Sequence, residues 1–372
     1  MKENKLETFN EDEQDVLNSV RTSRIIFPIL IGLGVVFYLL YQQFDPDEFA
    51  KIEWKQHTQF WVLMSFLLLV VRHIAYATRL RILTEGEFTW KKCIELIFIW
   101  EFSSAVSPTS VGGSAVAMVV LAQEKLPAAK TTTLVLYSAV LDTIFFVGVL
   151  PILFLVFGTN MIRPNMNSLA DIDGWAYTFF GAYVFMAIYG AIFFYGLFIS
   201  PQAIKRIIVG ATRISFLKKR REKAIQLGDD MILASKELLT KKWSFHLGGF
   251  LSTATAWSCR FLLLNCLIIA FVNISTDFDT QSNLYARLQT MYVIMAFSPT
   301  PGGAGFAEVL FGGFLSDYVN SGTLALIIAF IWRLFTYYLY LLVGVIVIPN
   351  WIKNVINDRK LKRMKSGDES SS

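Results

Sequence analysis

Histidine, cysteine and charged residues are all scarce in this chain. Its 372 residues include three histidines and three cysteines, and charged residues make up 17% of the sequence. The histidines are scattered and no Cys-x-x-Cys pair occurs, so no ligand set for a metal ion can be recognised. No HExxH motif, Asp-rich motif or Cys/His pair suggests catalysis. We therefore predict no metal site, no cofactor and no enzymatic activity.

Apolar residues, by contrast, are abundant and clustered. Hydrophobic residues make up 54% of the chain and aromatic residues 15%, with 32 Phe. About 20 consecutive apolar residues cross the hydrocarbon core of a bilayer. The segments that reach or approach this length are Ile25–Tyr41, Phe60–Leu83, Leu134–Phe157, Trp175–Ile199, Phe245–Val272 and Leu324–Ile348. The sequence therefore predicts an all-α polytopic membrane protein with six full spans, in a transmembrane domain of residues 25–348.

Basic residues in the connecting segments predict the orientation, because Lys and Arg concentrate on the cytoplasmic side. The leading tail, residues 1–24, carries four Lys and Arg, the tail 349–372 is basic, and residues 200–244 carry eleven Lys and Arg. No small-residue cleavage site follows the first apolar segment, so we expect a true span there rather than a secretory signal. We predict a protein of the cytoplasmic membrane with both termini and the 200–244 loop on the cytoplasmic side.

Two similar sequence motifs, named the first and the second phrase below, interrupt the apolar runs. The first, SPTSVGGSA, begins at Ser107, and the second, SPTPGGAGF, begins at Ser298. Residues 93–123, which contain the first phrase, have basic residues near both ends. Residues 285–317, which contain the second, are flanked by loops without Lys or Arg. Neither segment is predicted to cross the membrane once; each should be a re-entrant hairpin or a pair of short helices, and the two should enter from opposite sides.

The order of span, hairpin and span thus occurs twice, in residues 60–157 and 245–348, with opposite topology. The registers also agree: Pro108 precedes Asp142 by 34 residues, and Pro299 precedes Arg333 by 34 residues. Inverted repeats with broken helices are typical of secondary transporters. Coincidence in an apolar chain of low complexity is the alternative.

The phrases have a composition that suits an anion site. Proline ends a helix, and paired glycines permit a tight reversal that leaves backbone N–H groups uncovered. Irregular backbone survives at membrane depth only where protein surrounds it or water reaches it, and a following helix N-terminus attracts anions. A close helix crossing is the alternative interpretation. The candidate residues are Ser107, Thr109, Gly112, Gly113, Ser298, Thr300, Gly302 and Gly303.

Charged residues inside the apolar segments are a second set of candidates. A charge at mid-depth costs about 2.5–3.5 kcal/mol on insertion scales, so such residues normally face a cavity and pair there. Arginine holds phosphate through a bidentate fork, so a cavity for a phosphate-bearing substrate is one interpretation and structural ion pairs are the other. Arg79 lies near a predicted helix end, and we expect it to reach the membrane surface. The remaining candidates for substrate binding are Arg72, Asp142, Arg260, Arg333, Glu101 and Glu308.

The second phrase also resembles a family signature. Pro299 through Glu308, with support from the first phrase, resembles the lysylphosphatidylglycerol synthase transmembrane region, also called the flippase-like domain or UPF0104 family, over roughly residues 23–347. In the multiple peptide resistance factor this domain moves aminoacylated phosphatidylglycerol to the outer leaflet, and a separate soluble domain attaches the amino acid. Only residues 349–372 follow the last span here, so the resemblance implies lipid translocation without lysyl transfer.

Three classes of function follow from the sequence. The first is a flippase-like carrier that moves an anionic phospholipid or lipid-linked headgroup between leaflets. The second is a transporter of a small soluble anion, and the third is a membrane enzyme or a non-catalytic accessory subunit of a lipid-modifying enzyme. The expected partners are membrane lipids, with a lipid-synthesising enzyme as a further candidate and no nucleic acid.

Overall fold

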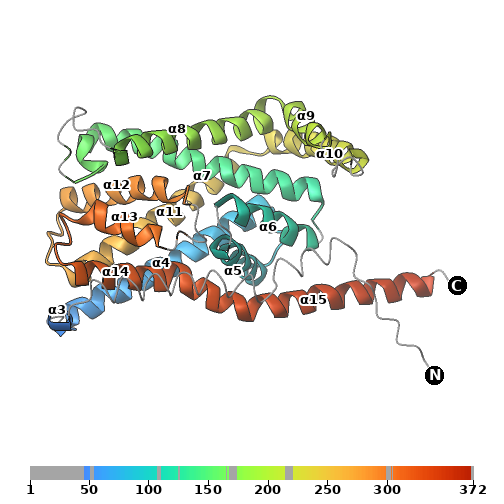
Figure 1. The fold of residues 1–372 in the computed structure, drawn as a ribbon. Coiled ribbons are helices and arrows are strands. Elements are labelled where there is room, and N and C mark those ends of the chain that lie inside the picture. The colour runs from blue at the N-terminus through green and yellow to red at the C-terminus, as the bar shows by residue number, and fades with distance from the viewer. Residues whose placement is uncertain are drawn as a thin grey trace, which may run out of the picture.

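Long helices run side by side through most of the molecule (Figure 1). The computed structural model describes residues 46–50, 54–106, 110–124, 126–164, 166, 174–213, 221–298, 303 and 305–369, with the side chains of some helical residues, Glu308 among them, left undescribed. Within these ranges the chain forms helices and connecting turns, without strands. The all-α prediction is therefore confirmed for the part of the chain that the structure describes.

Five helices are long and apolar enough to cross a membrane. They lie at Gln56–Leu83, Ala129–Met161, Gly174–Ile199, Trp243–Phe271 and Gly322–Val355. Each matches one predicted span, whereas the remaining predicted span, Ile25–Tyr41, lies outside the described residues. Large apolar side chains face outward from these helices; Leu155 is 85% exposed and Tyr177 is 68% exposed. Such surfaces suit contact with lipid tails.

The long helices are built from several helical elements. These are α4 (Gln56–Leu83), α7 (Ala128–Phe157) with the 3-10 turn η1 (Gly158–Met161), α8 (Gly174–Phe194) with the π-turn η3 (Tyr195–Ile199), α11 (Trp243–Phe271), and α14 (Gly322–Arg333) with the π-turn η6 (Leu334–Tyr338) and α15 (Leu339–Glu369). Helices α4 and α11 pack against each other extensively. The short helix α3 (Pro46–Ala50) precedes α4.

Both segments that contain the phrases are pairs of short helices. Helix α5 (Trp90–Val106) ends just before the first phrase and α6 (Ser110–Gln123) begins within it. Helices α12 (Phe278–Met295) and α13 (Phe306–Leu315) lie on either side of the second phrase. The helices of each pair pack against one another. In Figure 1 the α5–α6 pair lies toward the end of the molecule that carries α9 and α10, and the α12–α13 pair lies toward the opposite end.

Local sequence explains how the second pair begins and reverses. Asp277 caps α12 by accepting a hydrogen bond from the backbone N–H of Thr280 at 2.8 Å. Before α13, Gly303 and Gly305 take φ angles of 71° and 79°. This left-handed conformation is disfavoured for residues with a Cβ. Gly303, the described member of the second glycine pair, thus has the conformation that the sequence predicts for a reversal.

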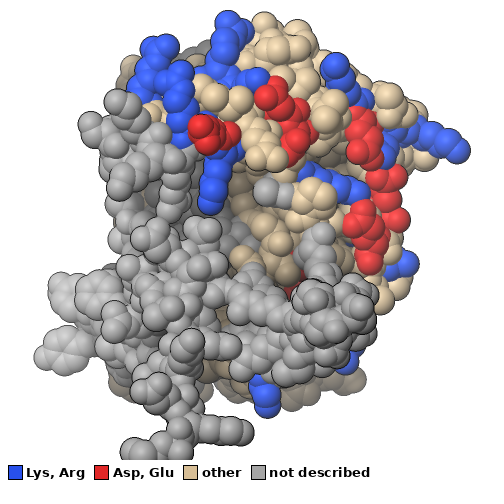
Figure 2. Space-filling model, turned by 90° about the vertical axis from the view of Figure 1, so that its right-hand side faces the viewer, with Lys and Arg blue, Asp and Glu red and all other residues tan. Residues whose placement is uncertain are grey.

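The loop of residues 200–244 contains two helices, α9 (Pro201–Ala211) and α10 (Arg221–Thr240), which pack together. Ion pairs gather at this end of the molecule: Lys92 contacts Glu95 and Glu124, and Lys241 contacts Glu85 and Glu237. Figure 2, which views this end, shows acidic and basic side chains around a hollow.

Candidate functional site

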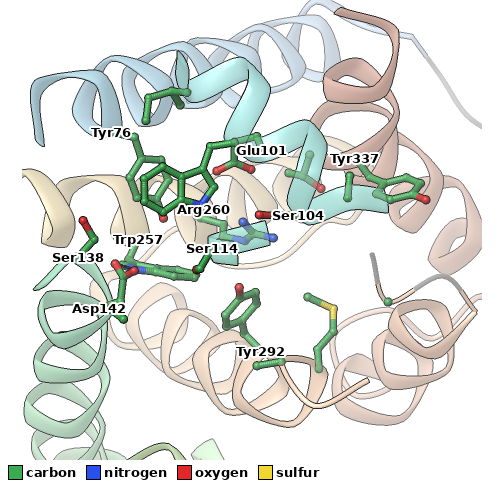
Figure 3. A pocket seen from close by; sticks show the side chains of 18 of the residues that line it. Tyr76, Glu101, Ser104, Ser114, Ser138, Asp142, Trp257, Arg260, Tyr292 and Tyr337 are labelled. Carbon is green, nitrogen blue, oxygen red and sulfur yellow. Dashed lines mark hydrogen bonds between the residues drawn. The ribbon is translucent and has the colours of Figure 1, made fainter. Parts of the chain in front are cut away.

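A cavity of about 220 Å³ lies where the two broken helix pairs meet the long helices. Its walls come from α4, α5, α6, α7, α11, α12, the turn after α12, α14 and η6. One buried water needs only about 10–15 Å³ of such volume, so the cavity has room for a hydrated polar group. Six of the predicted site residues line it, namely Glu101, Asp142, Arg260, Ser298, Gly303 and Arg333. Residues from both sequence halves therefore converge here, as Figure 3 shows for those it labels.

The two carboxylates of the cavity each pair with an arginine of α4. Nη2 of Arg72 lies 2.6 Å from Oε1 of Glu101, and Nη1 of Arg79 lies 2.6 Å from Oδ1 of Asp142. The side chain of Glu101 is 19% exposed and that of Asp142 is 30% exposed, so both carboxylates face the open space. Helix α4 thus neutralises the acids that α5 and α7 contribute.

Arg72 does not line the cavity itself. It is fully buried behind Glu101, and its Nη1 donates a hydrogen bond to the hydroxyl of Tyr340 at 2.9 Å. The Tyr76 ring also lies under its guanidinium, 5.1 Å from the ring centroid. Arg72 therefore positions Glu101, and the structure does not place it where a substrate in the cavity would touch it.

Arg79 departs from the sequence prediction. We expected it to reach the membrane surface, but its side chain is 7% exposed. Besides Asp142, its Nη1 donates to Oγ1 of Thr253 on α11 at 3.2 Å. Helix α4 packs against α11 there and continues to Leu83, so Arg79 points into the bundle, and that prediction was wrong.

Arg260 occupies the middle of the cavity. In Figure 3 its guanidinium lies between Glu101 on one side and Tyr292 on the other. The guanidinium carbon is 4.8 Å from the ring centroid of Tyr292 and 5.5 Å from that of Trp257. Among the described residues no carboxylate lies within ion-pair distance of Arg260, and its buried Nε has no hydrogen-bond partner there. Aromatic faces attract a cation but leave the guanidinium hydrogens available to an anion.

Arg333 approaches the cavity from the second repeat. Its guanidinium carbon lies 4.1 Å from the ring centroid of Tyr337, and both residues line the cavity. The π-turn η6 begins at the next residue, Leu334. Such turns shift the helical register, are uncommon, and occur frequently at functional sites. Here the turn directs Thr336 and Tyr337 toward the same space as Arg333.

The remaining predicted residues fall into two groups. Ser107, Thr109, Thr300 and Gly302 lie outside the described residues. Gly112 and Gly113 lie in the first turn of α6, which begins at Ser110, so this pair belongs to a helix rather than to the reversal that we predicted. Glu308 lies in α13.

Sequence reasoning missed most of the aromatic and hydroxyl residues of the cavity. The indole Nε1 of Trp257 donates to Oδ1 of Asp142 at 2.9 Å, and nothing in the sequence marked this tryptophan. Tyr292 could have been found, because it precedes Pro299 by seven residues just as Glu101 precedes Pro108 by seven. The other missed lining residues include Tyr76, Trp100, Ser104, Ser114, Ser138 and Tyr337.

A second, apolar pocket of about 160 Å³ adjoins the polar cavity. The two share Asp142, Trp257 and Tyr292 among their lining residues. The apolar pocket continues between α7, α8 and the turn after α12, where Phe185 and Phe297 line it. A polar space and an apolar space thus meet at the same residues.

These features define a multi-pass helical membrane protein with a charged cavity between two broken helix pairs. The model of the family described as the lysylphosphatidylglycerol synthase TM region matches residues 25–344. The chain therefore belongs to this family. It is also similar to a UPF0104 membrane protein of Archaeoglobus fulgidus, with 23% identity over 331 residues that cover 86% of this chain and 94% of the relative. No solved structure matches the chain.

Proposed function

We propose that this protein moves an anionic phospholipid or lipid-linked headgroup between the leaflets of a membrane, and that it does so without catalysing a reaction. The observation that carries the proposal is Arg260, a guanidinium inside the cavity with no carboxylate partner among the described residues. A phosphate that leaves water needs such a partner, because an uncompensated charge at membrane depth is costly.

The chemistry of the cavity suits a phosphate. The carboxylates of Glu101 and Asp142 are already neutralised by Arg72 and Arg79, so the charge of Arg260 remains for a ligand. The guanidinium fork matches two phosphate oxygens. Hydroxyl groups of Ser104, Ser114 and Ser138 line the same space and can donate to further oxygens.

The arrangement of the helix pairs suits alternating access from two sides. We propose that α5–α6 and α12–α13 are re-entrant pairs of opposite topology within inverted repeats, with α9, α10 and both termini on the cytoplasmic side. The element order supports this proposal, because a long helix, two short helices and a second long helix occur in each half. Residues of both helix pairs line the cavity, as in transporters that bind their substrate between inverted repeats.

The apolar pocket favours a lipid over a soluble anion. A soluble anion needs a polar vestibule, whereas a lipid needs an apolar space beside the headgroup site. The pocket of about 160 Å³ supplies such a space, and it shares Asp142 with the polar cavity. Acyl chains can remain in apolar surroundings while the headgroup occupies the polar cavity.

The test is leaflet exchange in liposomes that contain the purified protein. A labelled anionic phospholipid should exchange several-fold faster than in empty liposomes when an ion gradient is supplied, while trapped inorganic phosphate should be retained. Release of phosphate without lipid exchange would favour the soluble-anion transporter instead. If neither process exceeds its rate in empty liposomes across several anionic headgroups, the proposed function is wrong.

A further inference from the structure

The apolar pocket runs from the buried interior to the outer surface of the helix bundle. At its inner end lie Phe146, which is 2% exposed, and Trp257, which is 7% exposed. At its outer end lie Phe185, which is 58% exposed, and Phe297, which is 43% exposed. The pocket therefore connects the wall of the polar cavity with the face of the protein that lipid tails would contact.

Two aromatic rings are in contact at the outer end of the pocket. The rings of Phe185 and Phe297 meet edge to face, with centroids 5.2 Å apart and an angle of 87° between their planes. Phe185 belongs to α8, which lies between the two repeats, and Phe297 belongs to the turn that breaks the second helix pair. Because the two rings come from separate segments, a small displacement of either segment separates them.

Helix α8 is anchored close to this contact but not at it. A Cβ added at Gly190 would lie 2.1 Å from Cγ2 of Thr143 on α7, so the two helices cross very closely at that glycine. Phe185 lies on the same helix five residues earlier, and two residues before it the Tyr183 hydroxyl donates a hydrogen bond to the carbonyl of Val147 on α7 at 3.2 Å. Helix α8 is thus held against α7 on both sides of Phe185, whose own side chain is 58% exposed. Rotation of that side chain, or a shift of the turn that carries Phe297, would separate the two rings.

We propose that the gap between α8 and the turn after α12 is a lateral portal for an acyl chain, with Phe185 and Phe297 as its gate. This inference rests on the proposed function, because it assigns the apolar pocket to the tail of the lipid whose headgroup Arg260 binds. The continuity of the apolar pocket with the polar cavity, through Asp142, Trp257 and Tyr292, is what selects a lipid as the occupant. One molecule then spans both spaces, with its tail leaving sideways into the bilayer.

The first experiment closes the gate. The double variant Phe185→Cys/Phe297→Cys in liposomes is treated with a short, reducible thiol cross-linker, and exchange of a labelled anionic phospholipid is measured before and after reduction. Cross-linking should slow exchange by at least about tenfold, and reduction should restore it. The matched control is Trp54→Cys/Phe271→Cys, which replaces another edge-to-face pair, with centroids 5.6 Å apart, away from the portal. Cross-linking of the control should leave exchange unchanged.

The second experiment tests the portal without measuring transport. A phospholipid with a photoreactive group in one acyl chain is incorporated with the parent protein, and the labelled residues are identified by mass spectrometry. Labels should concentrate around Phe185 and Tyr189 on α8 and around Phe146 on α7, and excess unlabelled phospholipid should remove them. Labels spread evenly along the outer faces of α7 and α8 would contradict the portal.

The two experiments separate failure of the portal from failure of the proposed function. If the parent protein exchanges lipid but the cross-linked double variant exchanges it equally fast, the portal is wrong and the proposed function stands. If the parent protein exchanges no lipid but the acyl label concentrates in the pocket, the portal stands as a lipid site and translocation is wrong.

Discussion

Arg72 and Glu101 form a buried ion pair at the back of the cavity, with Nη2 and Oε1 2.6 Å apart. The arginine side chain is fully buried and the glutamate side chain is 19% exposed. The pair joins the middle of α4 to the C-terminal half of α5. Because α4 also packs against α11, this contact links the first helix pair to the long helix that carries Arg260.

Removing one member of this pair should destabilise the protein. Glu101→Gln leaves the Arg72 charge buried without its carboxylate, and breaking a buried pair in this way costs about 3–5 kcal/mol. We expect a clear fall of the thermal midpoint in detergent. The corresponding change Asp142→Asn should have a smaller effect, because the side chain of Asp142 is 30% exposed to the cavity. An equal or larger effect for Asp142→Asn would contradict this ranking.

The pair of Arg79 and Asp142 can be tested by a double-mutant cycle. Arg79→Gln and Asp142→Asn should each lower the thermal midpoint, and the double variant should lose less than the two single losses added together. Residues in direct contact typically couple by about 0.5–3 kcal/mol. Strictly additive losses would show that the contact at 2.6 Å contributes nothing. An exposed Arg79 would also give no coupling, so the cycle tests its burial.

Gly303 provides a test of the broken helix. Its φ of 71° is unfavourable for a residue with a Cβ, at a cost of about 1–2 kcal/mol. A Cβ there would meet Cγ of Met295 at 3.4 Å, an ordinary contact, so strain rather than crowding is the expected effect. Gly303→Ala should lower both the thermal midpoint and the rate of lipid exchange.

The matched control for this change is Gly313→Ala in α13. Gly313 is exposed, and a Cβ there would meet nothing within 4 Å. Alanine is favoured over glycine in helices by about 0.8–1.0 kcal/mol, so this variant should keep or raise the thermal midpoint. If both variants lowered the thermal midpoint equally, the left-handed backbone of Gly303 would not be the cause of the loss.

The thermal stability of the protein should depend on pH through Asp277, which caps the start of α12. Hydrogen bonds from the Ser275 hydroxyl and from the N–H and hydroxyl of Thr280 lower the pKa of Asp277 from 3.8 to about 2. A carboxyl pKa that is lower in the folded state adds stability. This stability is fully present above the pKa of the unfolded state and is lost as the pH falls through the pKa of the folded state. The thermal midpoint of Asp277→Ala should therefore lie below that of the parent near neutral pH, and the difference should vanish as the pH approaches 2.

Asp279→Ala is the control for the pH effect, because Asp279 lies in the same turn but does not cap the helix. It removes an equal charge, so a general charge effect would lower both midpoints alike. A difference between parent and Asp277→Ala that persists unchanged down to pH 2 would contradict the capping role.

The sequence predicted the long helices and the two breaks because those features depend on local composition. Runs of apolar residues determine the spans, and a Ser-Pro-Thr sequence with a glycine pair close behind it favours the end of a helix. The common spacing from Pro108 to Asp142 and from Pro299 to Arg333 also selected two residues that do line one cavity. These patterns can be read without knowing how the helices pack.

The partners of each charge could not be predicted in this way. Whether Arg79 reaches the membrane surface or Asp142 depends on the rotation of α4 against α7 and α11, and apolar helices carry little periodicity that fixes this rotation. The same applies to Trp257, whose indole bonds Asp142 although its sequence context is ordinary. The reversal predicted at Gly112 and Gly113 was also wrong, because α6 begins before them at Ser110.

The most direct test of the central claim is the rate of anionic phospholipid exchange by Arg260 variants in liposomes. A hydrogen bond to a charged group is worth about 1.5–3 kcal/mol, so Arg260→Gln should slow exchange by about 10–100-fold. Arg260→Lys should slow it less, because lysine keeps the charge without the fork. Arg206→Gln, at an exposed position of α9, is the control and should exchange at the parental rate. If Arg260→Gln, inserted and folded with a parental thermal midpoint, exchanges lipid as fast as the parent, Arg260 does not bind the headgroup and the account is contradicted.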